Sequence, residues 1–350
     1  MILKQSKSIK MMNVDTVNKY KDMLSREFEY LRISVTDRCN YRCSYCMPSE
    51  IFNKDYSYIK QSKILSYEEI IQITTILKKI GLKKIRITGG EPLLRKNIDK
   101  LIYKLKNEVG IKDVSMTTNG SLLTDKKLNE LKASGLDSVT LSLDTLQFDK
   151  TAQINGTKKT FDLDKVLEGI EKYFNIVKTN TVVIKSINDE EVLDIIDKMI
   201  GINSEVRFIE YMDVGESNNW NLDKVVPSSQ LLKLIISRYN LSLIDTNKSS
   251  TAQKWSIDNT NTSVGFISSI TEPFCNGCNR ARLSVDGKLY TCLFATEGHD
   301  LKKIIRAGAS DQDVLDYFYN IWSKRSDRYS ELRFINKIDS PKVEMSYIGG

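Results

Sequence analysis

The stretch LRISVTDRCNYRCSYCMP, residues 31–48, contains the features that decide the fold. Its β-branched start, residues 31–36, predicts a β-strand. A loop with three cysteines, Cys39, Cys43 and Cys46, follows at once. Spacings of three and two residues put three thiolates on one compact loop, where they can bind three irons of a [4Fe–4S] cubane. The fourth iron then lacks a protein ligand, and a chelating substrate needs such an open position, as in catalytic zinc sites.

Three other interpretations of this loop are a chance thiol cluster, a zinc site and a disulfide framework. A structural zinc site needs four ligands, and the only histidine, His299, lies far away in the sequence. Disulfide frameworks are typical of small secreted chains. This chain has 350 residues, and its first thirty are polar and lack the apolar segment of a signal peptide. An iron–sulfur cluster is therefore the better hypothesis.

Composition sets wide limits on function. With 41% hydrophobic and 28% charged residues, the chain has the make-up of an ordinary soluble globular protein. No apolar run approaches the ~20 residues that cross a bilayer, so we expect a cytoplasmic protein with no membrane partner. The net charge of +7 fits nucleic acids, nucleotides or other anions, but most lysines lie on solvated helix faces and the charge alone decides nothing.

Short β-branched runs alternate with amphipathic helical stretches from residue 31 onward. This alternation predicts right-handed βαβ units and a parallel sheet. An open sheet and a partial (β/α) barrel both fit the periodicity. The predicted strands are residues 31–36, 84–88, 113–118, 139–143, 177–184 and 205–212, and the predicted helices are 66–81, 97–108, 124–134, 163–174 and 190–200.

The rhythm changes after residue 213, which suggests three parts: an N-terminal extension (1–27), an α/β part (28–213) and a C-terminal part (214–350). The C-terminal part begins with a polar stretch and continues with a helix after Pro227 and a Ser/Thr/Asn-rich segment at 247–251. We predict two short strands there, at 263–269 and 282–293, with a turn at 286–287.

A second cysteine triplet, Cys275, Cys278 and Cys292, lies in this C-terminal part. Zinc and a second cluster with an open iron are both possible. Arg280 and Arg282 alternate beside it on a predicted strand and should point the same way. Two guanidiniums on one face suit a polyphosphate, because they bind phosphate bidentately. Two surface arginines on an edge strand are the alternative.

The first triplet, with Tyr45 before its last cysteine, resembles the signature of the radical S-adenosylmethionine (SAM) superfamily. The sequence GGEP (89–92) at the end of the next strand strengthens the likeness, since paired glycines let the backbone approach a ligand closely. From about residue 28 onward the chain resembles GTP 3′,8-cyclases of molybdenum-cofactor biosynthesis. The matching stretches include IRITGGEPLLR, RFIEYMDVG, CNGCNRARLSVDGKLYTCLFA and the terminal YIGG.

This resemblance implies a fold, cofactors and site residues. The fold is an incomplete (β/α)6 TIM-like barrel with a C-terminal α+β part, and the cofactors are two [4Fe–4S] clusters, the second on the second triplet, with SAM as co-substrate. The implied contacts with SAM are Tyr45, Gly90, Ser142 and Met212. From chemistry alone, Met212 suits simple packing and Ser142 an N-cap. The implied GTP contacts are Arg32, Arg86, Thr117, Lys178, Arg280, Ala281 and Arg282, of which Arg32, Arg280 and Arg282 are the catalytic arginines. The family also inserts a tail, here Gly349–Gly350, toward the active site.

The implied reaction starts with reductive cleavage of SAM to a 5′-deoxyadenosyl radical. That radical removes the ribose 3′ hydrogen of GTP, and the carbon radical attacks C8 of guanine. Two departures from the family are a long N-terminal extension and the sequence INGTKKT (154–160), and we expect neither to touch a ligand of the site. The chain also needs an electron donor of unknown identity, and a homodimer is possible.

Two rival functions draw on the same features. A peptide-modifying radical SAM enzyme with an auxiliary cluster would usually carry more C-terminal cysteines and would not need the R-A-R run (280–282). A non-catalytic zinc or iron–sulfur protein that binds nucleic acid would explain the positive charge. That second rival leaves GGEP unexplained, and no aromatic stacking platform is visible, so we expect no nucleic-acid partner.

Overall fold

The computed structural model describes residues 20–247, 249–333, 335 and 341–349. Six strands alternate with helices in the first part and form the parallel centre of one sheet. These strands are β1 (Tyr30–Ser34), β2 (Lys84–Thr88), β3 (Asp113–Thr118), β4 (Ser138–Ser142), β5 (Val177–Val183) and β6 (Ser204–Glu210). The helices of this part are α2 (Tyr67–Lys78), α3 (Ile98–Tyr103), α4 (Asp125–Ala133), α5 (Phe148–Asn155), α6 (Leu163–Phe174) and α7 (Val192–Met199).

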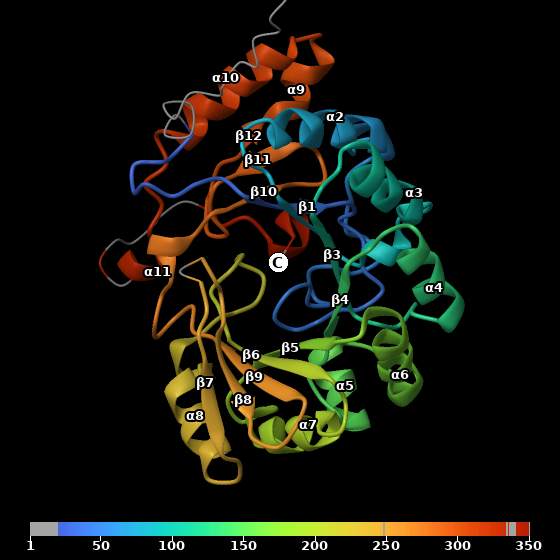
Figure 1. The fold of residues 1–350 in the computed structure, drawn as a ribbon, viewed down its shortest axis with the longest axis vertical. Coiled ribbons are helices and arrows are strands. Elements are labelled where there is room, and N and C mark those ends of the chain that lie inside the picture. Colours follow the sequence, from blue (N-terminus) through green and yellow to red (C-terminus); the bar gives the residue numbers. More distant parts are fainter. Residues whose placement is uncertain (1–19, 248, 334, 336–340, 350) are drawn as a thin grey trace, which may run out of the picture.

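The sheet curves around the middle of the molecule, with α2, α3, α4, α6 and α7 on its outer side (Figure 1). This is the incomplete barrel that the family resemblance implies, and it decides between the open sheet and the partial barrel that the periodicity left possible. Local signals place these helices as expected, except for α5, which the sequence did not predict. At the start of α2 the backbone N–H of Glu69 donates to Oγ of Ser66 (3.1 Å), and that of Ser66 donates to the Glu69 carboxylate (2.7 Å). This is the predicted capping box.

The C-terminal part adds six strands to the same sheet, and their role in it was not predicted. They are β7 (Leu241–Ile244), β8 (Gln253–Ile257), β9 (Thr262–Ile267), β10 (Arg280–Leu283), β11 (Lys288–Tyr290) and β12 (His299–Asp300). β9 pairs in parallel with β6, and β10 pairs in parallel with β1, so the two ends of the six-strand barrel are extended by later segments. The full order is β12-β11-β10-β1-β2-β3-β4-β5-β6-β9-β8-β7. The predicted division at residue 213 stays a prediction, because strands from both sides share this sheet.

Two sequence expectations for this part need correction. The strand expected at 282–293 is a hairpin of β10 and β11 around the turn at Asp286–Gly287. β7 and β8 were missed, and the Ser/Thr/Asn-rich segment lies in the loop that joins them. Leu243 and Ile244 of β7 are exposed, so this edge strand lacks the burial pattern that identifies strands in a sequence.

Helices of the C-terminal part lie mostly on the outer surface, and the last of them lies inside the curve of the sheet (Figure 1). They are α8 (Ser228–Ile236), α9 (Leu301–Arg306), α10 (Asp311–Trp322), α11 (Tyr329–Leu332) and α12 (Met345–Ile348). α12 lies near the centre of the view in Figure 1. In the described part of the chain no helix is both long enough and apolar enough for a membrane span.

Strand alternation separates an apolar outer face from a polar inner one. In β1, Leu31 and Ile33 are fully buried in the core with the outer helices, while Arg32 between them faces inward. The same alternation puts Arg86 of β2 and Asn180 of β5 on the inner face. A closed TIM barrel fills its interior with branched apolar side chains. Here the interior is polar, and it holds the candidate site.

Candidate active site

One cavity of about 780 Å³ occupies the inside of the curved sheet. All six cysteines line it: Cys39, Cys43, Cys46, Cys275, Cys278 and Cys292. The two triplets come from segments more than two hundred residues apart in the sequence. Because β10 pairs in parallel with β1, the loop before β10, with Cys275 and Cys278, lies beside the start of β1, whereas the first triplet follows the other end of β1. The two triplets therefore face the cavity from opposite ends of these strands.

The first triplet is held by its own loop. The backbone N–H groups of Cys46 and Met47 donate to the carbonyl of Cys43 (3.0 and 2.8 Å). Arg42 donates through Nη1 to the carbonyl of Cys39 (2.8 Å) and through Nε to that of Phe52 (2.6 Å). The loop conformation is thus fixed by backbone contacts that leave the three sulfurs directed at the cavity.

Burial keeps these thiols neutral in the absence of a cation. It raises the pKa of Cys39 to about 11, and it raises the pKa of Cys43 and Cys46 as well. A metal ion deprotonates a coordinating thiol outright. Such a site therefore suits thiols that lose their protons when they bind the irons of a cluster better than it suits a free, reactive thiolate.

A polar network supports the sulfurs from behind. Nδ2 of Asn155 donates to Sγ of Cys43 (3.4 Å) and to Oδ2 of Asp144 (3.1 Å). The hydroxyl of Tyr45 donates to the same carboxylate oxygen (2.8 Å). Asn155 is part of the sequence 154–160 that we expected to touch no ligand, and that expectation was wrong. The contact arises because α5 ends at Asn155, where its last carbonyls accept from the backbone of the cysteine loop.

Gly89 and Gly90 are required by a close approach of two backbones. A Cβ at Gly90 would lie 2.2 Å from the carbonyl oxygen of Arg38, and one at Gly89 would lie 2.5 Å from that of Thr36. Gly89 also has a φ of +143°, which side chains rarely adopt. The paired glycines therefore bring β2 against the cysteine loop, a role that the sequence did not reveal.

Glu91 links this turn to β3 and was missed by the sequence analysis. Its buried carboxylate accepts from the hydroxyl of Thr118 (2.8 Å) and from the backbone N–H groups of Asn119 and Leu93 (2.9 and 3.0 Å). Burial raises its pKa to about 7 despite these three donors. The only signal in the sequence was its place in GGEP.

The four residues expected to contact SAM all line the cavity. Tyr45 and Gly90 belong to the turns beside the first triplet, Ser142 ends β4, and Met212 lies two residues after β6. Ligand sites of α/β barrels lie at this C-terminal edge of the strands. Their contact with SAM stays a prediction, which this placement supports.

Arginines from three neighbouring strands form a row on the inner face. Arg32 pairs in register with Arg282 of β10 on one side and with Arg86 of β2 on the other. Burial together with the charge of Arg280 lowers the pKa of Arg282 to about 10. Burial and the charge of Arg282 lower the pKa of Arg32 well below its usual value. Cations that lie this close together and away from water repel one another, and a bound anion would relieve that repulsion.

Buried polar atoms in the same region point the same way. Among the described residues, Nε of Arg86, Oγ1 of Thr117 and Oδ1 of Asn180 are buried without a hydrogen-bond partner. All three side chains line the cavity. Buried polar groups are rarely left unpaired in a functional protein, so these atoms are suited to a bound polar molecule.

Not every expected substrate contact reaches the cavity. Arg280 and Arg282 both line it, as strand alternation predicts, but Ala281 between them is fully buried on the opposite face. Lys178 shares the inner face of β5 with Asn180 but lies outside the cavity lining. For Ala281, only backbone atoms could serve a ligand.

Three further basic residues line the cavity: Lys84, Arg207 and Lys254. Arg207 and Lys254 share the carboxylate of Glu205 (2.6 and 2.8 Å). This pairing lowers the pKa of Glu205 to about 2 against the opposing effect of burial. The sequence analysis did not name these three residues. They lie at inward-facing positions of their strands, so strand alternation could have identified them only if the inner face had been known to be polar.

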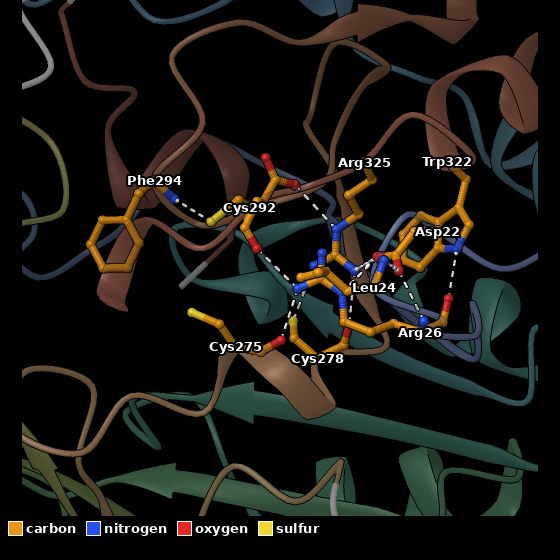
Figure 2. Close-up of polar contacts among 10 residues, drawn as sticks. Asp22, Leu24, Arg26, Cys275, Cys278, Cys292, Phe294, Trp322 and Arg325 are labelled. Carbon is orange, nitrogen blue, oxygen red and sulfur yellow. Dashed lines mark hydrogen bonds and ion pairs between the residues drawn. The ribbon is translucent and has the colours of Figure 1, made fainter. Parts of the chain in front are cut away.

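The second triplet lies in a more positive environment than the first. Burial opposes ionisation of Cys278, but Arg280 and Arg325 outweigh it and lower the pKa of this thiol to about 6. Burial raises the pKa of Cys292 to about 12, and it also raises the pKa of Cys275. Figure 2 shows the three cysteines with the buried arginines beside them.

Neither triplet has the geometry of a one-metal site. Within the described ranges, no three His, Cys, Asp or Glu side chains converge closely enough to hold a single metal ion. A cubane does not require this, because each thiolate binds a different iron. The donor chemistry, three cysteines on each side of one cavity, thus fits a cluster on each triplet.

The last described residues lie beside the arginine row. Nη1 of Arg282 donates to the carbonyl of Gly349, and Gly349 packs against Ser34 and Thr88 of β1 and β2. This is the position expected for a tail directed at the site. Gly350, the other residue of the predicted tail, lies outside the described residues, as do residues 1–19 of the predicted extension.

Comparison with known proteins agrees with this geometry. The family model described as the Radical SAM superfamily matches residues 33–199, and that described as Molybdenum Cofactor Synthesis C matches residues 204–331. The GTP 3′,8-cyclase of Staphylococcus epidermidis is 43% identical over 338 residues, which cover 94% of this chain and 98% of that protein. The GTP 3′,8-cyclase of Aquifex aeolicus is 40% identical over 332 residues, with 94% and 99% covered.

Among solved structures, Streptococcus suis SuiB bound to S-adenosylmethionine superposes with a TM-score of 0.61 at 17% identity. The match covers 93% of this chain and 76% of that one. SuiB has also been solved with its precursor peptide SuiA, at a TM-score of 0.57 and 17% identity. At this identity the likeness is one of fold, and it gives the peptide-modifying alternative no further support.

Proposed function

Because the chain belongs to the GTP 3′,8-cyclase family of radical SAM enzymes, we propose that it cyclises GTP to (8S)-3′,8-cyclo-7,8-dihydroguanosine 5′-triphosphate, the first step of molybdenum cofactor biosynthesis. One observation carries the proposal for this chain's own residues. Two cysteine triplets face a single cavity, and a row of buried arginines lies between them. A non-catalytic metal protein has no need for that arrangement.

Cys39, Cys43 and Cys46 would hold the first [4Fe–4S] cluster, and SAM would bind at its open iron. When bound, this cluster supplies the electron that cleaves SAM reductively. Tyr45, Gly90, Ser142 and Met212 line the adjoining wall and would orient SAM.

Cys275, Cys278 and Cys292 would hold the second cluster on the opposite side, where its open iron would bind the guanine. GTP would then extend along the arginine row. Charge-assisted bonds from Arg32, Arg86, Arg280 and Arg282 suit its triphosphate, and Thr117 and Lys178 lie on the same inner face. Binding at both ends would hold the ribose in the part of the cavity between the two cysteine triplets. Such positioning contributes much of the rate in reactions of this kind.

The enzyme would receive its electron from a separate donor and would act in the cytoplasm. The tail carbonyl of Gly349 holds one N–H of Arg282. It would thereby orient the guanidinium toward the substrate.

The test is anaerobic iron and sulfide analysis with a matched pair of variants. About eight irons per chain are expected for two cubanes. Cys278→Ser should remove about four irons and abolish GTP-dependent turnover while SAM binding survives. Cys43→Ser should instead abolish formation of 5′-deoxyadenosine. Stoichiometric zinc in the second triplet, or normal 5′-deoxyadenosine formation by Cys43→Ser, would contradict the proposal.

A further inference from the structure

A buried arginine outside the cavity lining contacts one sulfur of the second triplet, that of Cys278. Nη2 of Arg325 lies 3.3 Å from Sγ of Cys278, and Nη1 donates to the carbonyl of the same cysteine (2.7 Å). Arg325 follows α10, and its side chain is 1% exposed. In Figure 2 it lies to one side of the three cysteines, near Asp22 and Trp322, and it is not part of the cavity lining.

Arg325 is held in this position from several directions. Nε donates to the carboxylate of Asp327 (3.1 Å), and Nη1 is 3.3 Å from that of Asp22. The guanidinium also stacks over the ring of Trp322, at 4.6 Å from its centroid. With so many contacts its planar fork has little freedom, so the N–H directed at the sulfur is preorganised.

A second buried arginine provides an internal comparison. Arg26 binds the same Asp22 carboxylate through Nε (2.6 Å) and is as deeply buried as Arg325. Its Nη1 donates to the carbonyl oxygens of Cys275 and Asp327 (2.8 and 2.9 Å). Within the described residues it makes no contact with a cysteine sulfur. The two arginines therefore share a carboxylate and a neighbourhood, and they differ in what they offer to the cluster ligands.

We propose that Arg325 is a positioning residue that sets the reduction potential of the second cluster through its hydrogen bond to the Cys278 sulfur. The inference rests on the proposed function, because it requires a cluster on the second triplet. It assigns a role to a residue that lies outside the cavity lining and touches neither substrate nor SAM.

The physical reason is charge. A cubane held by three thiolates is negative, and reduction adds one more negative charge. Hydrogen bonds to the sulfurs and the net charge around a cluster are among the factors that set its potential. A cation that donates to a cluster sulfur stabilises the reduced form more than the oxidised form, which raises the potential. The carboxylates of Asp22 and Asp327 offset the guanidinium at long range, but they leave the N–H to the sulfur in place.

The test compares three variants of the full-length holoenzyme. Arg325→Gln removes the charge, Arg325→Lys keeps the charge but loses the fork, and Arg26→Gln disturbs the shared Asp22 without touching a sulfur. The measurements are iron per chain, melting temperature and an EPR-monitored redox titration. SAM perturbs the first cluster's signal and thereby identifies the second.

We expect Arg325→Gln to shift the reduction equilibrium of the second cluster about tenfold toward the oxidised form, which is about 59 mV for a one-electron couple. Arg325→Lys should shift it less, and Arg26→Gln should leave it near the wild-type value even if its melting temperature falls. If Arg325→Gln loses about four irons, the potential of the second cluster is measured on Arg325→Lys instead. Retention of those irons in Arg26→Gln would then support a role of Arg325 at the cluster itself.

Two results would overturn the inference while the proposed function stands. One is a wild-type potential in both Arg325 variants with about eight irons bound. The other is an equal effect of Arg26→Gln on potential or iron, which would mean that the arginines only support the fold. Wild-type protein with only about four irons would remove the second cluster itself, and both proposals would fail.

Discussion

Replacement of Arg282 should separate substrate binding from stability, because the same charge favours one and opposes the other. Its side chain belongs to the row in which Arg32 lies between Arg282 and Arg86. Burial and the nearby charge of Arg280 lower its pKa to about 10, so the folded protein holds this cation at a cost when no anion is present. Arg282→Ala removes that cost together with the hydrogen bond to Gly349.

The expected loss in GTP binding follows from the bonds that the guanidinium can offer to phosphate. A hydrogen bond to a charged group contributes about 1.5–3 kcal/mol. Loss of one such bond corresponds to a weakening of about 10- to 150-fold, since 1.4 kcal/mol is a factor of ten. SAM affinity should change little, because the residues expected to bind SAM lie on other strands. The melting temperature of the ligand-free protein should stay the same or rise.

The assay is anaerobic equilibrium binding of GTP and of SAM to reconstituted protein, with iron content measured on each sample. Arg238→Ala is the matched control, since this arginine is half exposed and pairs with Asp197 on the surface. Exposed pairs contribute little, so its effect on GTP binding should be near zero. GTP affinity of Arg282→Ala within a factor of two of wild type, with iron retained, would refute the reasoning and the triphosphate assignment with it.

Three further outcomes test the supports of the first triplet. Gly90→Ala places a Cβ 2.2 Å from the Arg38 carbonyl oxygen. It should destabilise the protein by roughly 3 kcal/mol or more, with loss of the first cluster's iron. The control is Gly265→Ala, whose Cβ would have its nearest contact at 3.4 Å and which should be close to neutral in thermal unfolding. Asn155→Ala leaves Asp144 short of a donor and should cost about 1–3 kcal/mol in unfolding free energy and lower iron retention at the first triplet; unchanged iron and stability would show that the network is incidental. The pKa of Glu91 is raised by burial to about 7, so its protonated form stabilises the fold fully below about 4.5, and this contribution is lost as the pH rises through about 7. Glu91→Gln should therefore remove this part of the pH dependence of the apoprotein's melting temperature between pH 5 and 8, and an identical slope in both proteins would contradict the shift.

Much of the fold could be predicted because its signals are local. The capping box at Ser66 and Glu69 and the β-branched run of β2 each specify an element within a few residues. The pairing of β10 with β1 could not be predicted, because it joins segments separated by about 250 residues and leaves no local trace. That pairing brings the second triplet to the cavity. The sequence could therefore name both triplets but could not place them together without the family resemblance.

The supporting residues were harder to predict than the ligands. Cysteines reveal themselves by type and spacing, whereas Asn155 and Glu91 are common residues whose roles come from what the fold places beside them. Asn155 contacts Cys43 only because α5 ends against the cysteine loop. Arg325 contacts Cys278 only because α10 returns to the loop before β10. The roles of such residues depend on tertiary packing, which local signals in a single sequence do not reveal.

The polar interior explains why binding and stability oppose one another in this barrel. An α/β barrel normally gains stability by filling its interior with apolar side chains. Here the inner positions of β10, β1 and β2 carry arginines in register, so the interior does not stabilise the barrel in this way. The apolar core between the sheet and the outer helices stabilises it instead. If a nucleoside triphosphate binds along the row as proposed, it would neutralise these charges, and the electrostatic interactions of the row would be favourable in the bound state only. The repulsion among the arginines destabilises the ligand-free protein, and its relief favours the binding of a polyanion over other ligands. We therefore expect Arg282→Ala to weaken GTP binding without lowering the stability of the fold.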